Sequence, residues 1–380
     1  MDFQLTEEQK MFQTMVRDFA KNELEPIADK LDANEEYPYE NIKKMAKLGI
    51  TGLTIPEEYG GSGGTPIEWC IAVEEIARAC ASTASVLDTS WGLCAHCIKV
   101  FGNEEQKKRF LVPLAKGEKI GAFGLTEPNA GSDISQLETI AVRDGDSYVL
   151  NGTKTFISNA AQADISIVFA SKDRTSGYKG ESAFIVEKGT PGFSIGQEFH
   201  RLGIRAAHNA EMVFEDCRIP AENLLGEEGR GFIIALATLD SARIGVACIA
   251  IGIARAALEA SIEHAKTRQQ YGQPIANFQA LRWMMADMAT EIDAARLLAY
   301  RAADLENRGA RFTTEAAMAK VFAADIAMRA ASNGLQIHGG YGYMMDSPMQ
   351  RYFRDAKITS IYEGTSEIQR FVIARSLLGG

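Results

Sequence analysis

The chain has 380 residues, 46% of them hydrophobic, and its 40 basic and 50 acidic residues give a formal net charge of −10. This length exceeds the size at which one hydrophobic core usually stops growing, so we expect two or three cooperating domains. The acidic excess is spread out with no basic block, which excludes nucleic acid as an expected partner, and no apolar run approaches the roughly 18 residues of a membrane span. The six scattered cysteines are too sparse for a disulfide framework and indicate a reducing cytoplasm.

Residues 1–120 are expected to form a helical domain. The segment TEEQ at residues 6–9 has the capping-box pattern, a hydroxyl residue followed three positions later by Gln, and apolar residues then recur at helical spacing. The loop at residues 55–64 has four glycines among its last five residues, which breaks the helical pattern. The segment CAHC at residues 94–97 is a single CxxC in an apolar, helix-like run. We interpret its cysteines as buried core residues and not as metal ligands.

Residues 121–228 are expected to form a β domain. Short runs rich in Val, Ile, Phe and Thr alternate there with the dipeptides Asp144-Gly145 and Asn151-Gly152, which are hairpin signals. In the predicted strand at residues 151–159, Phe156 and Ser158 fall on one face, where an aromatic ring and a hydroxyl can meet a ligand together. A core position is the alternative for both.

Residues 229–380 return to long helices. One stripe steps by four and three residues along a single helix face, and Asn307-Arg308-Gly309 follows it as a stop signal. The stripe consists of Leu281, Met285, Met288, Ile292, Ala295 and Ala299. Helices, then strands, then helices predict an α+β protein, because a Rossmann sheet would alternate strand and helix throughout. The chain has neither GxGxxG after a strand nor GxxxxGK[ST], so any nucleotide must be held in another way.

Two polar segments are candidates for chemistry. The segment GAFGLTEPNAGSD at residues 121–133 presents N–H groups and hydroxyls at a bend, which suits a polarised ring edge or a phosphate, although an ordinary strand-to-turn junction has the same composition. The segment IYEGTSEIQR at residues 361–370 contains Glu363, which is either a surface charge or a base that removes a proton. The local pattern also fits the start of a helix, so it leaves both interpretations open.

Seven segments together resemble acyl-CoA dehydrogenases, in the same order and over essentially the whole chain. They are LTEPNAGSD, NGTKTFISN, LGIRAAHNAEMVFEDCRIP, TLDSARIG, RQQYG, QIHGGYGY and IYEGTSEIQR. The forms TLDSARIG and EGTSEIQR look most like the short-chain, butyryl-CoA branch. The resemblance implies an N-terminal α-helical domain (1–120), a central antiparallel β domain (121–228) and a C-terminal four-helix bundle (229–380). It also implies FAD, a homotetramer, and electron exchange with an electron-transferring flavoprotein.

The resemblance implies cofactor-binding roles at positions in five parts of the chain. At the isoalloxazine and pyrophosphate it places Phe123, Leu125, Thr126, Ser132, Phe156 and Ser158. Many relatives have Trp where this chain has Phe156, so stacking is kept but the indole N–H is lost. At the diphosphate and adenine of a neighbouring subunit's cofactor it places Arg268, Gln336, Gly339 and Gly340, with a further cofactor contact at Gln279. Near the diphosphate, at a helix N-terminus, it places Thr365 and Glu367. For Arg268, a charge that meets a helix dipole is the alternative.

The resemblance implies a catalytic role for Glu363, which would exchange the α-proton of an acyl thioester while the β-hydride moves to flavin N5. It places at the substrate Asp88, Asp240, Arg243, Tyr362 and Gly364. A plain ion pair between Asp240 and Arg243, and a local polar partner for Asp88, remain the alternatives.

The substrate is left open between two classes. Asp88 falls on the helix expected to form the floor of the acyl pocket, and Ile249 stands where short-chain members carry a polar glutamine. These departures leave two substrates possible. One is a short straight-chain acyl-CoA, and the other is an arylacrylyl thioester such as caffeyl-CoA, which an electron-bifurcating complex would reduce. Acyl-CoA oxidases are much longer, and a flavin-free scaffold would not need Thr126, Ser132, Arg268 and Glu363.

Overall fold

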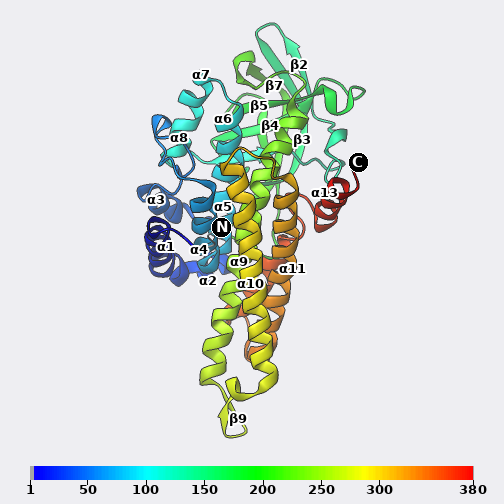
Figure 1. Ribbon diagram of the computed structural model, residues 1–380. Helices are drawn as coiled ribbons and strands as arrows, with labels where there is room; N and C mark the ends of the chain where they lie inside the picture. The colour runs from blue at the N-terminus through cyan, green and yellow to red at the C-terminus, as the bar shows by residue number, and fades with distance from the viewer. Residues whose placement is uncertain (1–3, 380) are drawn as a thin grey trace.

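The computed structural model describes residues 4–379, and its N-terminal part is helical as predicted (Figure 1). Thr6 caps the first helix with both hydrogen bonds of the predicted capping box. The helices are α1 (Glu7–Phe19), α2 (Glu25–Asn34), α3 (Tyr39–Lys47), α4 (Pro66–Ala79), α5 (Ala81–Leu87), α6 (His96–Phe101), α7 (Glu104–Gln106) and α8 (Val112–Ala115). Cys94 and Cys97 lie buried in the apolar core, on the π-helical segment Asp88–Ala95 and on α6.

The middle of the chain is a β sheet with the strand order β6-β7-β3-β2-β4-β5-β8, and β1 pairs with β4. The strands are β1 (Gly121–Gly124), β2 (Ile140–Asp144), β3 (Ser147–Ser158), β4 (Ile165–Ser171), β5 (Glu181–Glu187), β6 (Phe193–Glu198), β7 (Asn209–Pro220) and β8 (Leu224–Leu225). Most neighbours are antiparallel, but β4 runs parallel to β1 and, at one position, to β2. The sheet is therefore mixed, with antiparallel pairs in the majority.

One of the two predicted hairpin turns is wrong. Asp144-Gly145 does begin the turn between β2 and β3, whereas Asn151-Gly152 lies inside β3 at a bulge opposite β7. The Asn151 side chain bonds across the pair to the Asp216 backbone N–H (2.8 Å), so its turn-forming groups are used within the sheet. A Cβ atom on Gly152 would lie 2.7 Å from Thr139 Cα, which explains the glycine by close packing.

The C-terminal part is a bundle of long helices. They are α9 (Gly231–Thr267), α10 (Gln279–Asn307), α11 (Thr313–His338), α12 (Pro348–Ile358) and α13 (Ser366–Leu378). Along the predicted stripe, Met288, Ile292, Ala295 and Ala299 are buried, and α10 ends at Asn307 as expected. The short strands β9 (Gln269–Gln270) and β10 (Gln273–Pro274) form a hairpin at the end of the bundle farthest from the sheet (Figure 1).

Helix α9 is the central helix of this bundle. Its length and apolar composition alone would allow a membrane span, but 61% of its most apolar window is buried inside the protein. It packs against α4, α10, α11 and α12, which places it between the N-terminal domain and the rest of the bundle. Its apolar character is therefore accounted for by packing within the fold.

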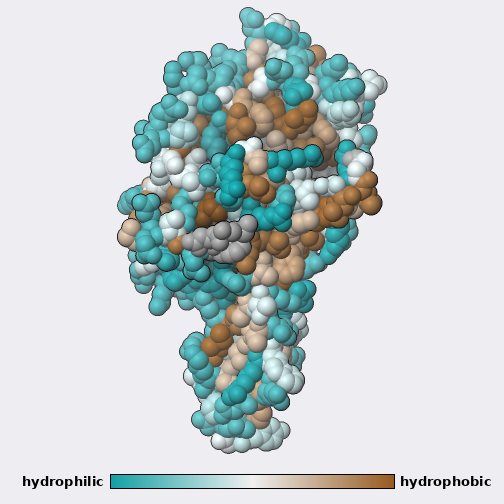
Figure 2. Space-filling view, viewed as in Figure 1, coloured by the Kyte–Doolittle hydropathy of each residue, from teal (hydrophilic) through white to brown (hydrophobic). Residues whose placement is uncertain are grey.

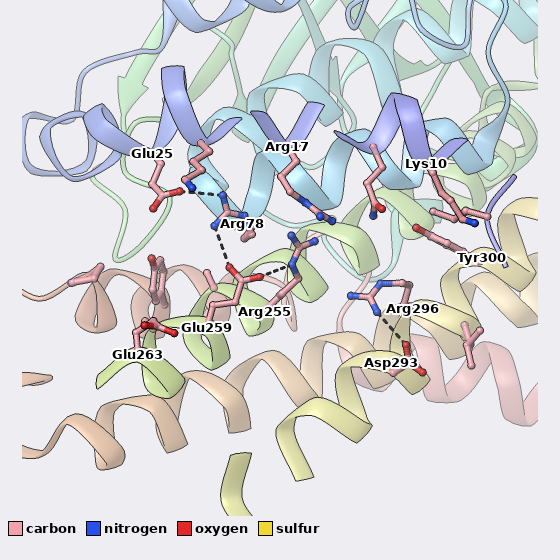
Figure 3. Close-up of a pocket in the computed structure, with 18 of the residues that line it drawn as sticks. Lys10, Arg17, Glu25, Arg78, Arg255, Glu259, Glu263, Asp293, Arg296 and Tyr300 are labelled. Atoms are coloured by element: carbon pink, nitrogen blue, oxygen red, sulfur yellow. Dashed lines mark hydrogen bonds and ion pairs between the residues drawn. The ribbon is translucent and has the colours of Figure 1, made fainter. Parts of the chain in front are cut away.

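Ion pairs join the N-terminal domain to the bundle. Glu74 and Glu75 of α4 are buried, and all four of their carboxylate oxygens accept hydrogen bonds from arginine side chains. The donors are Arg17 of α1, Arg255 of α9 and Arg296 of α10. The same three arginines line a cleft, and Figure 3 shows further ion pairs around it. There Arg78 bonds to Glu25 and Glu259, Arg255 to Glu259, and Arg296 to Asp293. We call Glu74, Glu75, Arg17, Arg255 and Arg296 the junction cluster.

Candidate active site

A cavity of about 190 Å³ brings together residues from all three parts of the chain. Its lining includes the predicted residues Phe123, Leu125, Thr126, Ser132, Phe156, Ser158, Arg243, Tyr362, Glu363 and Gly364. They come from β1 and the turn after it, from β3, from α9, and from the loop between α12 and α13. Segments that are far apart in the sequence thus form one site.

The turn after β1 is held in place by a buried ion pair. Glu127 accepts hydrogen bonds from Lys154 Nζ (2.6 Å) and from the Thr139 backbone N–H (3.0 Å), and both charged side chains are buried. The carbonyl oxygen of Thr126 accepts from the Thr155 backbone N–H (2.9 Å). These bonds fix the backbone that carries Leu125 and Thr126 into the cavity.

Phe156 and Ser158 both line the cavity, but strand β3 is irregular where it carries Phe156. A bulge lies between Lys154 and Ile157, and Phe156 has a φ of 56°, a left-handed conformation that costs an L residue about 1–2 kcal/mol. Phe156 is 62% exposed. A strained backbone that presents an exposed aromatic residue at a cavity is a feature that binding sites retain.

The Ser158 hydroxyl is oriented by an arginine. Arg201 Nη2 donates to Ser158 Oγ (2.7 Å), while Arg201 Nη1 is buried without a hydrogen bond partner among the described residues. Burial lowers the pKa of the Arg201 guanidinium to about 10. Because the serine oxygen accepts from Arg201, its own hydrogen is free to donate into the cavity.

The cavity fits a flavin. Its wall offers the exposed Phe156 ring for stacking, hydroxyls at Thr126, Ser132 and Ser158 for polar ring atoms, and an apolar face at Leu125.

Glu363 lies on the loop between α12 and α13, in a left-handed conformation with a φ of 52°. Its Oε2 atom is buried and has no hydrogen bond partner among the described residues. Burial raises the pKa of this carboxyl well above its ordinary range, and the Asp88 carboxylate raises it further, while Lys320 and Arg243 act in the opposite direction. The net result is a carboxyl that holds its proton to a higher pH than an exposed glutamate does.

A buried lysine holds the loop of Glu363. Lys320 of α11 is 0% exposed, and its Nζ donates to the carbonyl oxygen of Gly364 (2.6 Å). Gln369 Nε2 donates to the same oxygen (2.9 Å). Burial lowers the pKa of the Lys320 amine to about 8, against the raising effect of Glu363.

The predicted substrate residues divide into two groups. Tyr362, Gly364 and Arg243 line the cavity, and the Tyr362 hydroxyl is buried without a partner among the described residues. Asp240 does not line it; it pairs with Arg243 Nη1 (2.7 Å) and accepts from Thr313 Oγ1 (2.6 Å). The ion pair considered as an alternative is therefore present, with Arg243 on the cavity side.

Asp88 also lies outside the cavity lining, although its neighbour Thr89 belongs to it. It is 2% exposed, accepts a hydrogen bond from the Trp69 side chain, and has an Oδ1 atom without a partner among the described residues. A Cβ atom at Gly92 or Gly245 would collide with this oxygen, so both glycines leave room for the carboxyl. Burial raises the pKa of Asp88 to about 7. Ile249 is fully buried in the core and does not line the cavity either.

The remaining predicted cofactor residues lie elsewhere. A second cavity, of about 650 Å³, lies at the hairpin end of the bundle, and its lining includes Arg268, Gln336, Gly339 and Gly340. Gln279 is exposed at the start of α10, beside Phe278 of that lining. Thr365 and Glu367 line a surface pocket at the start of α13. Arg243 is on α9 and Arg268 follows its end, roughly 37 Å apart at the rise of about 1.5 Å per residue of an α-helix.

Family models match the chain in three consecutive parts. The model for the acyl-CoA dehydrogenase N-terminal domain matches residues 6–118, the middle-domain model matches 122–217, and the C-terminal-domain model matches 229–378. The chain belongs to the acyl-CoA dehydrogenase family. This membership confirms the resemblance found in the sequence, and it makes the chain an oxidoreductase of that family's fold.

Similar proteins and solved structures agree with this membership. The short-chain specific acyl-CoA dehydrogenase of Clostridium acetobutylicum is 52% identical and aligns over 98% of this chain and 99% of its own. The NADH-dependent acryloyl-CoA reductase of Anaerotignum propionicum is 51% identical over 100% of this chain and 96% of its own. A structure from work on the electron transferring flavoprotein of Acidaminococcus fermentans and flavin-based electron bifurcation has a TM-score of 0.98 and 49% identity, with both chains fully covered.

Two residues that bond to the cavity lining, Arg201 and Lys320, were missed in the sequence. Lys320 is a single lysine on an alanine-rich helix face that includes Ala316, Ala319 and Ala323, and a lone charge among buried positions was the signal that could have found it. Arg201 had no comparable signal, because it lies on an irregular loop between β6 and β7 where no periodicity indicates which side chains are buried.

Proposed function

We propose that the protein is an FAD-dependent acyl-CoA dehydrogenase that interconverts a short-chain acyl-CoA and its trans-2-enoyl-CoA, with Glu363 as the base. The observation that carries this proposal is the buried Oε2 atom of Glu363, which has no hydrogen bond partner within residues 4–379 and lies in the cavity that Phe156 and Ser158 also line. A buried carboxyl without a partner disfavours folding, so its presence in a cavity indicates a role in chemistry.

The residues that would hold FAD line the same cavity as Glu363. Phe156 would stack on the ring, and Thr126, Ser132 and Ser158 would bond to its polar atoms. Bound FAD supplies the acceptor for the hydride that leaves the β-carbon of the acyl chain.

Glu363 would exchange the proton of the α-carbon. Removal of that proton gathers negative charge on the thioester carbonyl oxygen, so a hydrogen bond donor at this oxygen lowers the barrier. The backbone N–H of Glu363 makes no hydrogen bond to another described residue, which leaves it available as that donor. Leu93, Phe123 and Leu125 line the cavity with apolar groups that would exclude water.

Reduction of a 2-enoyl-CoA is the second direction, and Asp88 favours it. Its carboxyl lies close enough to raise the pKa of Glu363, so Glu363 keeps a proton that it can deliver to the α-carbon of an enoyl thioester. The acryloyl-CoA reductase of Anaerotignum propionicum is a relative named for this direction. An arylacrylyl thioester such as caffeyl-CoA remains the alternative substrate class.

We infer that the electrons are exchanged with an electron-transferring flavoprotein and that the active form is a homotetramer in the cytoplasm. The Acidaminococcus fermentans work supports the flavoprotein partner. The predicted cofactor residues lie in two cavities at opposite ends of α9, roughly 37 Å apart along the helix, which is too far to hold one FAD within one copy. Apolar side chains gather on α13 (Figure 2), where Phe371, Leu377 and Leu378 are exposed, as expected for a surface that another copy covers.

The six cysteines are all free and buried, which fits a reducing compartment.

The Glu363→Gln variant tests the base. It keeps the shape of the side chain but cannot accept the α-proton, so we expect FAD to be retained and turnover to fall by about 10³-fold or more. Flavin absorbance measures the retained FAD. Butyryl-CoA dehydrogenation with an artificial electron acceptor measures the turnover. Wild-type turnover by Glu363→Gln would remove Glu363 from the mechanism.

Purified protein without flavin absorbance, even after added FAD, would support the scaffold alternative instead. Anaerobic bleaching of the flavin by butyryl-CoA indicates a straight-chain substrate. Reoxidation of the reduced enzyme by crotonyl-CoA, compared with caffeyl-CoA at the same concentration, separates the two enoyl classes and gives their relative rates.

A further inference from the structure

Lys320 is a fully buried lysine that forms no ion pair with any residue among 4–379. Its amine bonds to the carbonyl oxygen of Gly364, the residue directly after Glu363. A buried ammonium group without a carboxylate partner is costly. Lys154, which is also fully buried, is by contrast paired with Glu127.

The loop that Lys320 holds is strained. Glu363 and Gly364 have φ values of 52° and 92°, so two consecutive residues have left-handed conformations. A left-handed glutamate is unfavourable on its own and persists only where the surrounding structure fixes it. The Gly364 carbonyl receives two donors, Lys320 Nζ and Gln369 Nε2, and Gln369 also donates to the Glu363 carbonyl (3.3 Å).

The charges around Glu363 come from three other elements. Asp88 faces it from the segment Asp88–Ala95, Arg243 from α9 and Lys320 from α11, and Tyr362 precedes it on its own loop. Arg243 is already paired with Asp240. Of the two cations that lower the pKa of Glu363, Lys320 is therefore the one without a carboxylate partner among the described residues, with Asp325 and Glu367 as more exposed neighbours.

We propose that Lys320 is a positioning residue that fixes the Glu363 carboxyl at the cavity through the Gly364 carbonyl and offsets the negative charge of Asp88. This inference rests on Glu363 being the base. It adds a residue that touches neither substrate nor cofactor but determines where the base lies and at which pH it is ionised.

The Lys320→Met variant of the FAD-loaded enzyme tests this role. Methionine keeps the volume but loses the charge and the donor, so we expect kcat/KM with butyryl-CoA to fall about 10²-fold, as a displaced catalytic group does. We also expect the acidic limb of the kcat/KM profile to move to higher pH, because Glu363 loses a neighbouring cation. Exchange of the substrate α-proton with deuterated solvent should slow in the same proportion, while flavin absorbance is unchanged.

Two variants serve as comparisons. Arg329→Met removes a cation from α11 that pairs with Glu291 on the surface, and it should leave the pH profile unchanged. The Lys320 amine has a pKa of about 8, so its deprotonation would produce an alkaline limb in the wild type. Lys320→Arg keeps the charge at every accessible pH, so it should keep the acidic limb in place and move that alkaline limb to higher pH.

An acidic limb at the wild-type position in Lys320→Met would overturn the proposal. If that variant does not fold, Lys320→Arg decides, and a profile with both limbs at their wild-type positions is the contrary result. The base assignment is judged separately: full activity in Glu363→Gln removes the base itself, whereas an inactive Glu363→Gln beside an unaltered Lys320→Met removes only Lys320.

Discussion

Two groups of buried charge differ in how completely they are paired. In the junction cluster, each oxygen of Glu74 and Glu75 accepts a hydrogen bond from an arginine. Around the cavity, atoms of Asp88, Glu363 and Arg201 are buried without partners among the described residues, and Lys320 bonds only to a neutral carbonyl. The ion pairs of the junction hold two parts of the fold together, whereas the cavity keeps ionisable groups unpaired within the described part of the chain and so available for proton transfer and binding.

This difference shows how a static structure separates structural from chemical roles. Both groups are buried and both contain glutamate and arginine, so composition and burial alone would not distinguish them. Complete pairing lowers the pKa of Glu75, because the hydrogen bonds from Arg255 and Arg17 outweigh the raising effect of burial. Incomplete pairing leaves burial dominant at Glu363 and raises its pKa. The direction of the shift therefore follows from the count of partners.

The largest effect is expected where a junction charge is removed. Glu75→Gln leaves Arg17 and Arg255 without a full partner, which should lower the free energy of unfolding by about 3–5 kcal/mol at neutral pH. Since the folded-state pKa of Glu75 is lowered, its contribution is present above the unfolded-state pKa and is lost as the pH falls, so the variant and the wild type should converge in acid. Urea unfolding at two pH values measures this.

A matched control is Arg218→Gln, which removes an exposed ion pair with Asp144 and should change stability by less than about 1 kcal/mol. Equal decreases in the free energy of unfolding of Glu75→Gln and Arg218→Gln would contradict the distinction between buried and exposed ion pairs.

A smaller effect of opposite sign is expected at Asp88. Raising its pKa from 3.8 to about 7 corresponds to roughly 4 kcal/mol of stability lost at alkaline pH. The loss begins as the pH rises above the unfolded-state pKa and is complete above about 7. Asp88→Asn removes it but leaves amide hydrogens that need partners, at a cost of about 1–3 kcal/mol, so the net gain should be about 2 kcal/mol at alkaline pH.

Urea unfolding of Asp88→Asn at about pH 8 and at about pH 5 checks this, with the gain confined to the higher pH. In the same variant, the acidic limb of dehydrogenation should move to lower pH because Glu363 loses a neighbouring anion. Destabilisation at both pH values would show that the Asp88 carboxylate is paired after all.

The sequence predicted the order of the three parts because each has its own periodicity. Helical spacing before residue 121, alternation with turn residues after it and a long stripe from Leu281 are local patterns, and β1 and α9 begin at Gly121 and Gly231. The Asn151-Gly152 turn was wrong because its Asn side chain bonds across the sheet to the Asp216 backbone, a tertiary contact that no local pattern contains.

The site was predictable only as far as its motifs reach. Ordered segments located Glu363, Tyr362, Phe156 and Ser158, and one cavity contains all four. The depth of Asp88 behind the lining depends on two glycines, one of them on α9, and the role of Lys320 depends on a contact between α11 and a loop 44 positions away. Such features are set by packing between elements, which a single sequence does not encode locally.

Helix α9 connects the Arg243 end of the molecule to the Arg268 end as one continuous rod. If each chain lends its Arg268 end to a neighbour's cofactor, a defect there empties another chain's site and leaves its own base intact. Two inactive proteins, one carrying Glu363→Gln and the other Arg268→Met, would then complement each other: mixed assemblies would contain some sites with both parts sound. Activity recovered by coexpression of two inactive chains is the genetic signature of that shared architecture.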